Sequence, residues 1–160
     1  MMKEPDKCIE QEQVLSSHTK ERWWRRRREV EEWEQREKGI KKEKLTLPFL
    51  NDEVDVELFP ALSLLNSMGI VTEYSCAGVS ELDDPVSHSL YAYVTLRESE
   101  AAQVFLAYLR GKMRHRLLVV YEPARRRYDI SSFYIRHNRS FCFLLYHYAL
   151  QWKNTCPMVE

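Results

Sequence analysis

The sequence predicts an α+β fold: a mainly antiparallel sheet of about four strands, with helices on one face and a charged N-terminal helix. Three observations predict it. Residues 69–153 hold two successive strand–strand–helix patterns, and a short amphipathic helix precedes them. A hydrophobic share of 44%, with 12% aromatic residues, supplies one core in a chain of 160 residues. The resulting order, α-ββα-ββα, favours antiparallel pairing with the helices packed on one side of the sheet.

The first 45 residues differ in composition from the α+β domain that we expect at 46–160. Residues 1–18 show no hydrophobic periodicity, so we expect them to be disordered or loosely attached. Residues 19–44, TKERWWRRRREVEEWEQREKGIKKEK, have a helical composition that Gly39 interrupts.

The helix predicted at 19–44 combines a stripe on one side with paired charges. The stripe consists of Trp23, Val30, Trp33 and Glu37. Opposite charges stand four residues apart, as in Arg25 with Glu29 and Arg28 with Glu32. Arginines beside tryptophans also suit nucleic-acid phosphates and bases. We favour a solvated helix that its tryptophans pin to the body, because the glutamates neutralise most of the basic block. A partner-binding or dimerising role stays open.

The chain then turns from an extended segment into a short helix. Residues 45–53, LTLPFLNDE, are predicted to form an extended connector, because Pro48 disfavours helix at the residue before it. In the helix that follows, Pro60 is tolerable only in the first turn. Leu58, Leu62 and Leu65 are spaced for one face, and Gly69 stands where a helix C-cap glycine belongs.

Two strand–strand–helix units make up the rest. In the first, strands at 69–76 and 87–97 precede a helix at 100–113 that Ser99 caps. Its second strand alternates Leu90, Ala92, Val94 and Leu96 with Tyr91, Tyr93 and Thr95. The inward positions of the helix are predicted to be Val104, Ala107, Tyr108 and Leu109. In the second unit, strands at 115–122 and 128–137 precede a helix at 140–153, capped by Asn138 or Ser140. The N-terminal tryptophan helix could cover the other sheet face.

Composition excludes several classes of protein. No apolar run is long enough to span a membrane, and the N-terminus is too polar for a secretory signal, so we expect a cytoplasmic protein. The four cysteines have irregular spacing, which argues against a disulfide framework or a zinc site: Cys8, Cys76, Cys142 and Cys156. His115 and His147 have no clustered carboxylates, and no dinucleotide or phosphate-loop motif is present. We therefore expect no metal and no cofactor.

The formal net charge of zero hides an asymmetry along the chain. Residues 46–100 carry one basic and ten acidic side chains, whereas residues 101–160 carry ten basic and three acidic ones. Either the C-terminal half builds a basic surface that attracts anions, or the two halves complement each other across the fold.

One segment carries a family resemblance. Residues 57–78, ELFPALSLLNSMGIVTEYSCAG, resemble small bacterial and bacteriophage proteins with Leu-Asn, Gly-Ile-x-Thr and Ser-Cys-x-Gly motifs. The likeness covers about residues 54–110, and its matching positions are Asn66, Gly69, Thr72, Ser75, Cys76 and Gly78. A phage origin would place the protein in the host cytoplasm. A more distant likeness, to the Tyw3 wybutosine-synthesis family, implies S-adenosylmethionine-dependent RNA modification. Those enzymes have Arg, and the phage-type proteins often His, where this chain has Val79.

The Ser75–Gly78 turn is the first candidate site. Its small residues allow backbone N–H groups to approach a ligand closely. Cys76 has acidic neighbours at Glu73, Glu81, Asp83 and Asp84, with His88 the nearest histidine in sequence. With no local cation to stabilise a thiolate, we expect Cys76 to be structural or ligand-lining rather than a nucleophile.

A second candidate site is the arginine-rich stretch YEPARRRYDISSFYIRHNR. Arginines beside a helix N-terminus favour anions, and two tyrosines on one strand face could stack on a base. Its members are Arg125, Arg126, Arg127, Tyr128, Tyr134, Arg136, His137 and Arg139.

These features lead to one preferred function and two alternatives. The preferred function is non-catalytic binding of a phosphorylated small molecule or RNA, in a phage-encoded protein that sequesters a nucleotide signal. The alternatives are a protein–protein or homo-oligomeric module using helix 19–44, and the RNA-modifying transferase.

Overall fold

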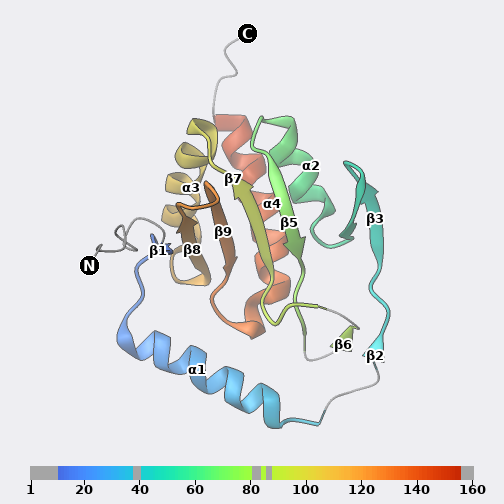
Figure 1. Cartoon of the computed structure of the whole chain (residues 1–160), viewed down its shortest axis with the longest axis vertical. Coiled ribbons are helices and arrows are strands. Elements are labelled where there is room, and N and C mark those ends of the chain that lie inside the picture. The colour runs from blue at the N-terminus through green and yellow to red at the C-terminus, as the bar shows by residue number, and fades with distance from the viewer. Residues whose placement is uncertain (1–10, 38–40, 81–83, 86–87, 156–160) are drawn as a thin grey trace, which may run out of the picture.

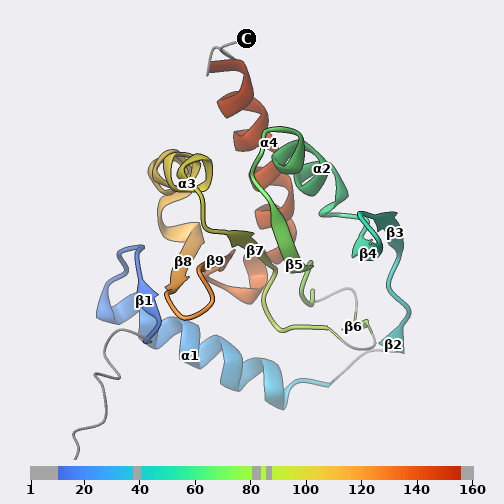
Figure 2. The ribbon, with the colours of Figure 1, turned by 45° about the horizontal axis from the view of Figure 1, so that its top comes forward.

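The computed structural model of the protein describes residues 11–37, 41–80, 84–85 and 88–155. Within these residues the main sheet has five antiparallel strands in the order β1-β8-β9-β7-β5. Three helices cover one face of this sheet (Figures 1 and 2). The strands are β1 Gln13–Val14, β5 Thr72–Cys76, β7 Tyr93–Arg97, β8 Leu117–Glu122 and β9 Arg127–Ser132. The helices are α2 Phe59–Ser67, α3 Glu100–Met113 and α4 Asn138–Thr155. The predicted α+β class with an antiparallel sheet is confirmed.

The core lies between the sheet and these helices. As predicted, Ala92, Val94 and Leu96 are fully buried on one side of β7. The apolar face of α2, Leu58, Leu62 and Leu65, is also buried. Pro60 lies in the first turn of α2, and Gly69 follows its end with a φ of +79°. Each of these segments therefore folds as its spacing of apolar and turn residues dictates.

Helix α3 starts as predicted but presents a different face to the core. The Ser99 side chain accepts a hydrogen bond from the Ala102 N–H at 3.0 Å, the geometry of an N-cap. The predicted inward positions Val104 and Ala107 are wrong, because both are exposed. The buried face consists of Ala102, Phe105, Leu106, Leu109 and Met113.

The predicted extended connector is a β-hairpin instead. Strands β3 (Thr46–Phe49) and β4 (Asp52–Asp55) pair antiparallel through a two-residue turn. Leu50 and Asn51 both have positive φ, 48° and 67°, which is the backbone of a type I′ turn. The hairpin lies next to the β5 edge of the sheet and delivers Asp55, which is buried, toward the end of that strand.

Residues 11–18 are attached to the body, so the predicted disorder is wrong for this part of residues 1–18; residues 1–10 lie outside the described residues. Strand β1 pairs with β8, and the Leu15 N–H donates to the Val119 carbonyl at 2.8 Å. At the opposite edge, β5 contains a bulge between Thr72 and Ser75. Both edges of the sheet therefore have short or irregular ladders.

Helix α1 spans Lys20–Gln35 and ends nine residues before the predicted end at Lys44. Lys41–Lys42 form strand β2, which pairs with β6 (Asp84–Pro85). Helix α1 runs across the ends of the strands rather than over the open sheet face (Figure 1). None of its residues is fully buried.

Polar contacts hold α1 on the body, and of the expected tryptophan stripe Trp23 adds ring contacts with Phe133 and His18. The Arg26 guanidinium donates to the Phe133 carbonyl at 2.6 Å and lies 3.8 Å from the centre of the Tyr91 ring. The Glu29 carboxylate accepts from the backbone N–H groups of Ile135 and Arg136 at 2.5 and 3.2 Å. Trp23 contributes an edge contact with Phe133 but is 38% exposed.

The expected ion pairs within α1 also change partners. Arg25 pairs with Glu21 at 2.7 Å, one turn earlier than the predicted partner Glu29. Glu29 instead binds backbone groups of the body, because it lies on the inner side of the helix. Arg28 stacks over Trp24 at 5.3 Å.

Candidate functional site

Two neighbouring cavities open at the end of the sheet that α1 crosses. The first, about 360 Å³, lies between α1 and the start of α4, and the second, about 400 Å³, lies between the β3–β4 hairpin and the turn after β5. Ser80 and Arg139 line both. We call the two cavities together the rim groove. Its remaining lining residues are Glu29, Glu32, Trp33, Arg36, Glu43, Lys44, Leu45, Asp55, Glu57, Ala77, Gly78, Val79, Ile135, Arg136 and Cys142.

The turn after β5 forms one wall of the groove and is locked by Asn138. The Asn138 amide donates to the carbonyls of Val79 and Leu90, and its oxygen accepts from the Ala92 N–H and the Ser132 hydroxyl. Asn138 is 1% exposed, so these four bonds satisfy a buried amide. Although it starts α4, its side chain binds three other segments of the chain.

Gly78 is required where it stands in this turn. Its φ is +75°, and a Cβ placed on it would lie 2.5 Å from the Ala92 nitrogen and 2.6 Å from the Asn138 amide nitrogen. No side chain fits there without movement of the backbone or of Asn138. The Ser-Cys-Ala-Gly segment therefore owes its glycine to close packing.

Cys76 lies in a polar cluster that the sequence did not indicate. The Lys44 ammonium lies 3.2 Å from the Cys76 sulfur and 3.4 Å from the Asp55 carboxylate. The backbone N–H groups of Gly78 and Ser89 both approach the sulfur at 3.4 Å. The expectation that no cation lies near this thiol is wrong, because Lys44 reaches it from a segment 32 residues earlier.

Burial and charge set the ionisation of the groups around Cys76. Burial alone would lower the pKa of Lys44, but its contacts with Cys76 and Asp55 raise that pKa above its ordinary value. Burial, with the nearby Glu57 and Asp55 charges, raises the pKa of the Cys142 thiol to about 12. Cys142 is therefore a neutral lining residue at pH 7, and Lys44 a charged one.

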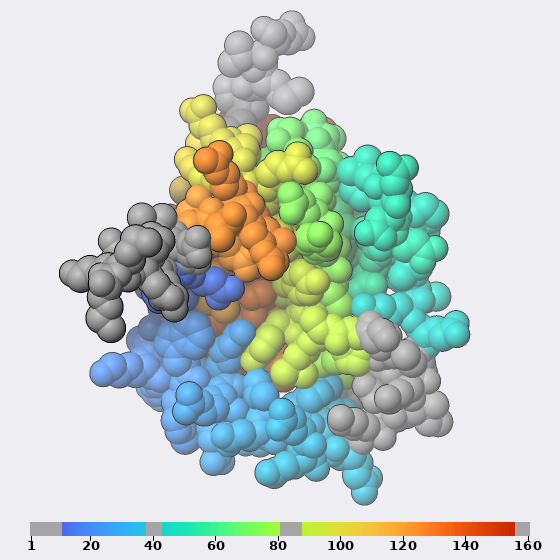
Figure 3. Space-filling view, in the orientation of Figure 1, coloured from blue at the N-terminus to red at the C-terminus, as the bar shows by residue number. Residues whose placement is uncertain are grey.

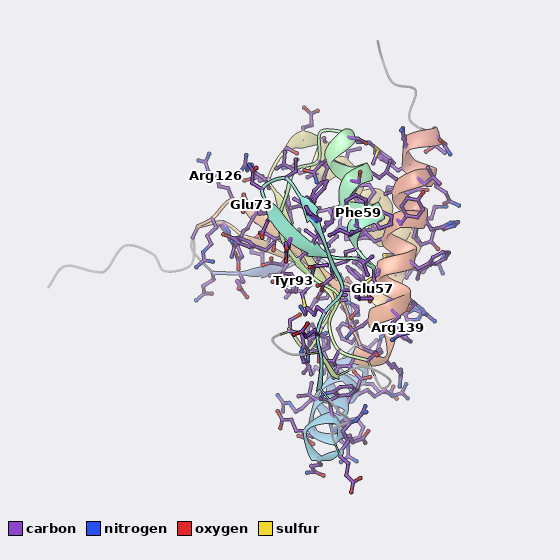
Figure 4. All side chains as sticks on the ribbon, turned by 90° about the vertical axis from the view of Figure 1, so that its right-hand side faces the viewer. Glu57, Phe59, Glu73, Tyr93, Arg126 and Arg139 are labelled. Carbon is purple, nitrogen blue, oxygen red and sulfur yellow. The ribbon has the colours of Figure 1, made fainter. Side chains whose placement is uncertain are left out.

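The predicted arginine cluster divides between opposite ends of the sheet. Arg136 and Arg139 line the rim groove, and Arg139 contacts the Ser80 hydroxyl at 3.3 Å. Arg125 and Arg126 lie in the β8–β9 turn, where they line a different cavity with Glu73 and Glu98. Figure 4 shows Arg126 next to Glu73, far from Arg139, which lies near Glu57.

The other members of the predicted cluster are also placed away from a common site. Arg127 pairs with Glu122 at 2.5 Å. Tyr128 and Tyr134 are 6% and 3% exposed, so the expectation that they stack on a base is wrong. Tyr128 instead packs on Tyr121 inside the core, with ring centres 5.0 Å apart.

The two candidate histidines, His88 and His137, are not among the residues that line the groove. His88 is partly buried beside Ser89, whose N–H contacts Cys76. Burial and the neighbouring Arg116 and Arg136 charges lower the pKa of His137 to about 4, so His137 is neutral at pH 7. The residues of the Ser75–Gly78 turn do not share one cavity. Ser75 lines a separate cavity under the β3–β4 hairpin, whereas Ala77 and Gly78 line the rim groove.

Sequence reasoning missed the groove residues Lys44, Asp55 and Trp33, as well as Asn138 as the residue that locks the turn. The sequence predicts Lys44 and Trp33 in the charged helix at 19–44, and Asp55 falls after the predicted connector at 45–53 with no role of its own. For Asn138 the sequence predicts only a possible helix cap. The one feature of the sequence that could have placed Asn138 at the groove is its position between Arg136 and Arg139.

The fold and groove define a small α+β protein with a mixed-charge groove at the rim of an antiparallel sheet. No family model, curated protein or solved structure that was compared with this chain matches it. Among the described residues, no helix is long and apolar enough to cross a membrane. In the same part of the chain, no three His, Cys, Asp or Glu side chains are grouped so that they could hold a metal ion.

Proposed function

We propose that the protein binds a phosphorylated small molecule, of the nucleotide class, in the rim groove. One observation supports this above all: Arg139 and Ser80 line both cavities and contact each other. The turn after β5 and the arginines of the α4 start, two separate candidates in the sequence, thus border one groove. The proposal assigns binding and no chemical step.

The cavity between α1 and α4 would receive the phosphate. Arg36, Arg136 and Arg139 line it, and the Ser80 hydroxyl adds a neutral donor. A guanidinium has five N–H donors, so Arg139 can keep its contact with Ser80 while it binds a phosphate oxygen. Two carboxylates, Glu29 and Glu32, also line this cavity. Glu29 accepts hydrogen bonds from the backbone N–H groups of Ile135 and Arg136, which reduces its repulsion of an anion.

Trp33 would provide the surface on which a base stacks. It is half-buried in the wall of the same cavity, and the Arg36 guanidinium lies 4.2 Å from its ring centre. Stacking of bases on tryptophan contributes about 1–3 kcal/mol per base and tolerates any base. The second cavity adds exposed carboxylates, Glu43 and Glu57, that can accept hydrogen bonds from the amino groups of a base.

The test is titration calorimetry of the full chain with nucleoside phosphates and cyclic dinucleotides. We expect at least one to bind, and the double variant Arg136→Ala/Arg139→Ala to weaken binding by about 100- to 10,000-fold, since each of the two charged hydrogen bonds contributes roughly 1.5–3 kcal/mol. The matched control is Arg125→Ala/Arg126→Ala, which removes the same charge at the other end of the sheet and should change affinity less than about twofold.

Three outcomes would contradict the proposal. One is that no nucleotide binds. Another is that both double variants weaken binding equally, which would mean diffuse attraction rather than a site. The third is binding of a short RNA or of S-adenosylmethionine alone, which would favour RNA recognition or the transferase activity implied by the wybutosine-family likeness. Sequestration of a signal in a host cytoplasm stays a prediction that depends on this binding.

A further inference from the structure

Helix α1 turns one side away from the body. Its inner side contacts the strand ends, while the outer side lies at the rim of the molecule (Figures 3 and 4). Residues spaced alternately four and three apart form a continuous outer stripe, the spacing by which two helices pair. The stripe consists of Lys20, Trp24, Arg27, Glu31 and Glu34, all exposed.

The charge of this outer side reverses at the middle of the helix. The charged residues of the stripe are Lys20 and Arg27 in the first half and Glu31 and Glu34 in the second half. A second α1 laid antiparallel would place each basic half against an acidic half. A parallel arrangement would place like charges together and would be repelled.

We propose that this outer face of α1 binds a second copy of the same chain, as an antiparallel helix pair about a twofold axis. The axis crosses the outer face between Arg27 and Glu31, so that Arg27 of each copy lies opposite Glu31 of the other. Trp24 of one copy then lies opposite Glu34 of the other, and the Trp24 ring can cover the methylene groups of that Glu34 side chain. Because the same patch serves on both copies, the assembly closes as a dimer.

Charge pattern and exposure favour a second copy over other occupants. A nucleic acid would meet repulsion from Glu31 and Glu34 of the second half, and Trp24 is the single apolar side chain that the stripe offers to an apolar partner. Trp24 is 59% exposed, which is unusual for the largest side chain of the stripe and leaves ring area for a partner. A copy of α1 matches both signs of charge in one register.

The dimer should be weak and sensitive to salt. Exposed ion pairs contribute little individually, and they are screened as the Debye length falls from about 30 Å at 0.01 M salt to about 3 Å at 1 M. Sedimentation velocity of the full chain over a concentration series should therefore show a dimer at low salt and a monomer at high salt. A chain that stays monomeric at low salt up to about 0.5 mM would overturn the proposal, since that is the range of a weak contact.

Charge reversal locates the contact. The variant Glu31→Lys/Glu34→Lys makes the stripe basic, and Lys20→Glu/Arg27→Glu makes it acidic. Each variant alone should be monomeric at low salt, whereas an equimolar mixture of the two should dimerise again. The control Arg125→Glu/Arg126→Glu changes charge far from α1 and should leave the dimer intact.

The same experiment separates misfolding and ligand binding from dimerisation. Recovery of the dimer in the mixture shows that both variants retain a folded α1. A dimer that persists in both single variants, or a mixture that stays monomeric while circular dichroism shows native helix content, would overturn the proposal. Nucleotide affinity is expected to be the same in all variants, because none of the four positions lines the rim groove.

Discussion

Replacement of Gly78 by alanine tests the packing of the turn that borders the groove. A Cβ at this position would lie 2.5 Å from the Ala92 nitrogen, 2.6 Å from the Asn138 amide nitrogen and 2.8 Å from the Tyr91 carbonyl carbon. Two of these three atoms belong to the backbone of the segment that enters β7. The methyl group cannot be accommodated by a side-chain rotation alone.

The expected loss of stability combines three effects. A left-handed backbone costs an alanine about 1–2 kcal/mol relative to glycine. Overpacking against the backbone adds about 1–3 kcal/mol. A displaced Asn138, which is buried with four hydrogen bonds, adds roughly 1 kcal/mol or more for each group left without a partner. The total of about 3–6 kcal/mol is a large part of the 5–15 kcal/mol that is typical of a folded domain.

Urea denaturation followed by circular dichroism measures this change, and two other glycines serve as controls. Gly69 has a φ of +79° and nothing within 4 Å of a Cβ, so Gly69→Ala should lose only about 1–2 kcal/mol. Gly111 lies in α3 with open space around it, so Gly111→Ala should gain about 0.5–1 kcal/mol. If Gly78→Ala loses no more stability than Gly69→Ala, the close-packing argument is refuted.

Two further predictions concern ionisable groups. Lys44→Met should destabilise the protein by about 1–3 kcal/mol, because it leaves the buried Asp55 carboxylate with one partner fewer. The control Lys153→Met, on the exposed side of α4, should leave the free energy of unfolding unchanged. Equal effects of the two variants in urea denaturation would contradict this prediction. Because burial lowers the pKa of His137 to about 4, the unfolded chain binds more protons between pH 4 and 6.5, so stability should fall as pH drops through that window. His137→Gln should flatten this dependence relative to the exposed-site control His147→Gln, and an unchanged slope would show that His137 does not cause it.

The sequence predicted those parts of the fold that local patterns determine. Alternation identified the buried side of β7, and the spacing of Leu58, Leu62 and Leu65 identified the core face of α2. Ser99 and Gly69 marked helix ends because capping depends on residues one to three positions away. In α3 the predicted helical spacing of apolar residues is correct, but the predicted inward face is rotated about the helix axis from the observed one. The reason is that this helix has apolar residues on more than one side.

The groove itself could not be predicted from local patterns. Its polar cluster consists of Lys44, Asp55 and Cys76, which belong to three separate segments of the chain. The β3–β4 hairpin brings these segments together, and the sequence predicts only an extended connector there. The β3–β4 turn places Leu50 in a left-handed conformation that leucine rarely adopts, so Asn51 alone, without a glycine beside it, marks the turn in the sequence. The sequence predicts one site in the arginine stretch, but its two ends lie at opposite ends of β9.

Both edges of the main sheet carry features that oppose pairing with the edge of another chain. A long straight edge would offer a row of unpaired backbone groups to other chains and promote aggregation. Here β1 covers part of the β8 edge, and the bulge between Thr72 and Ser75 breaks the β5 edge. Loss of residues 11–15 would uncover β8 and is expected to make the chain prone to fibrillar association even where its fold survives.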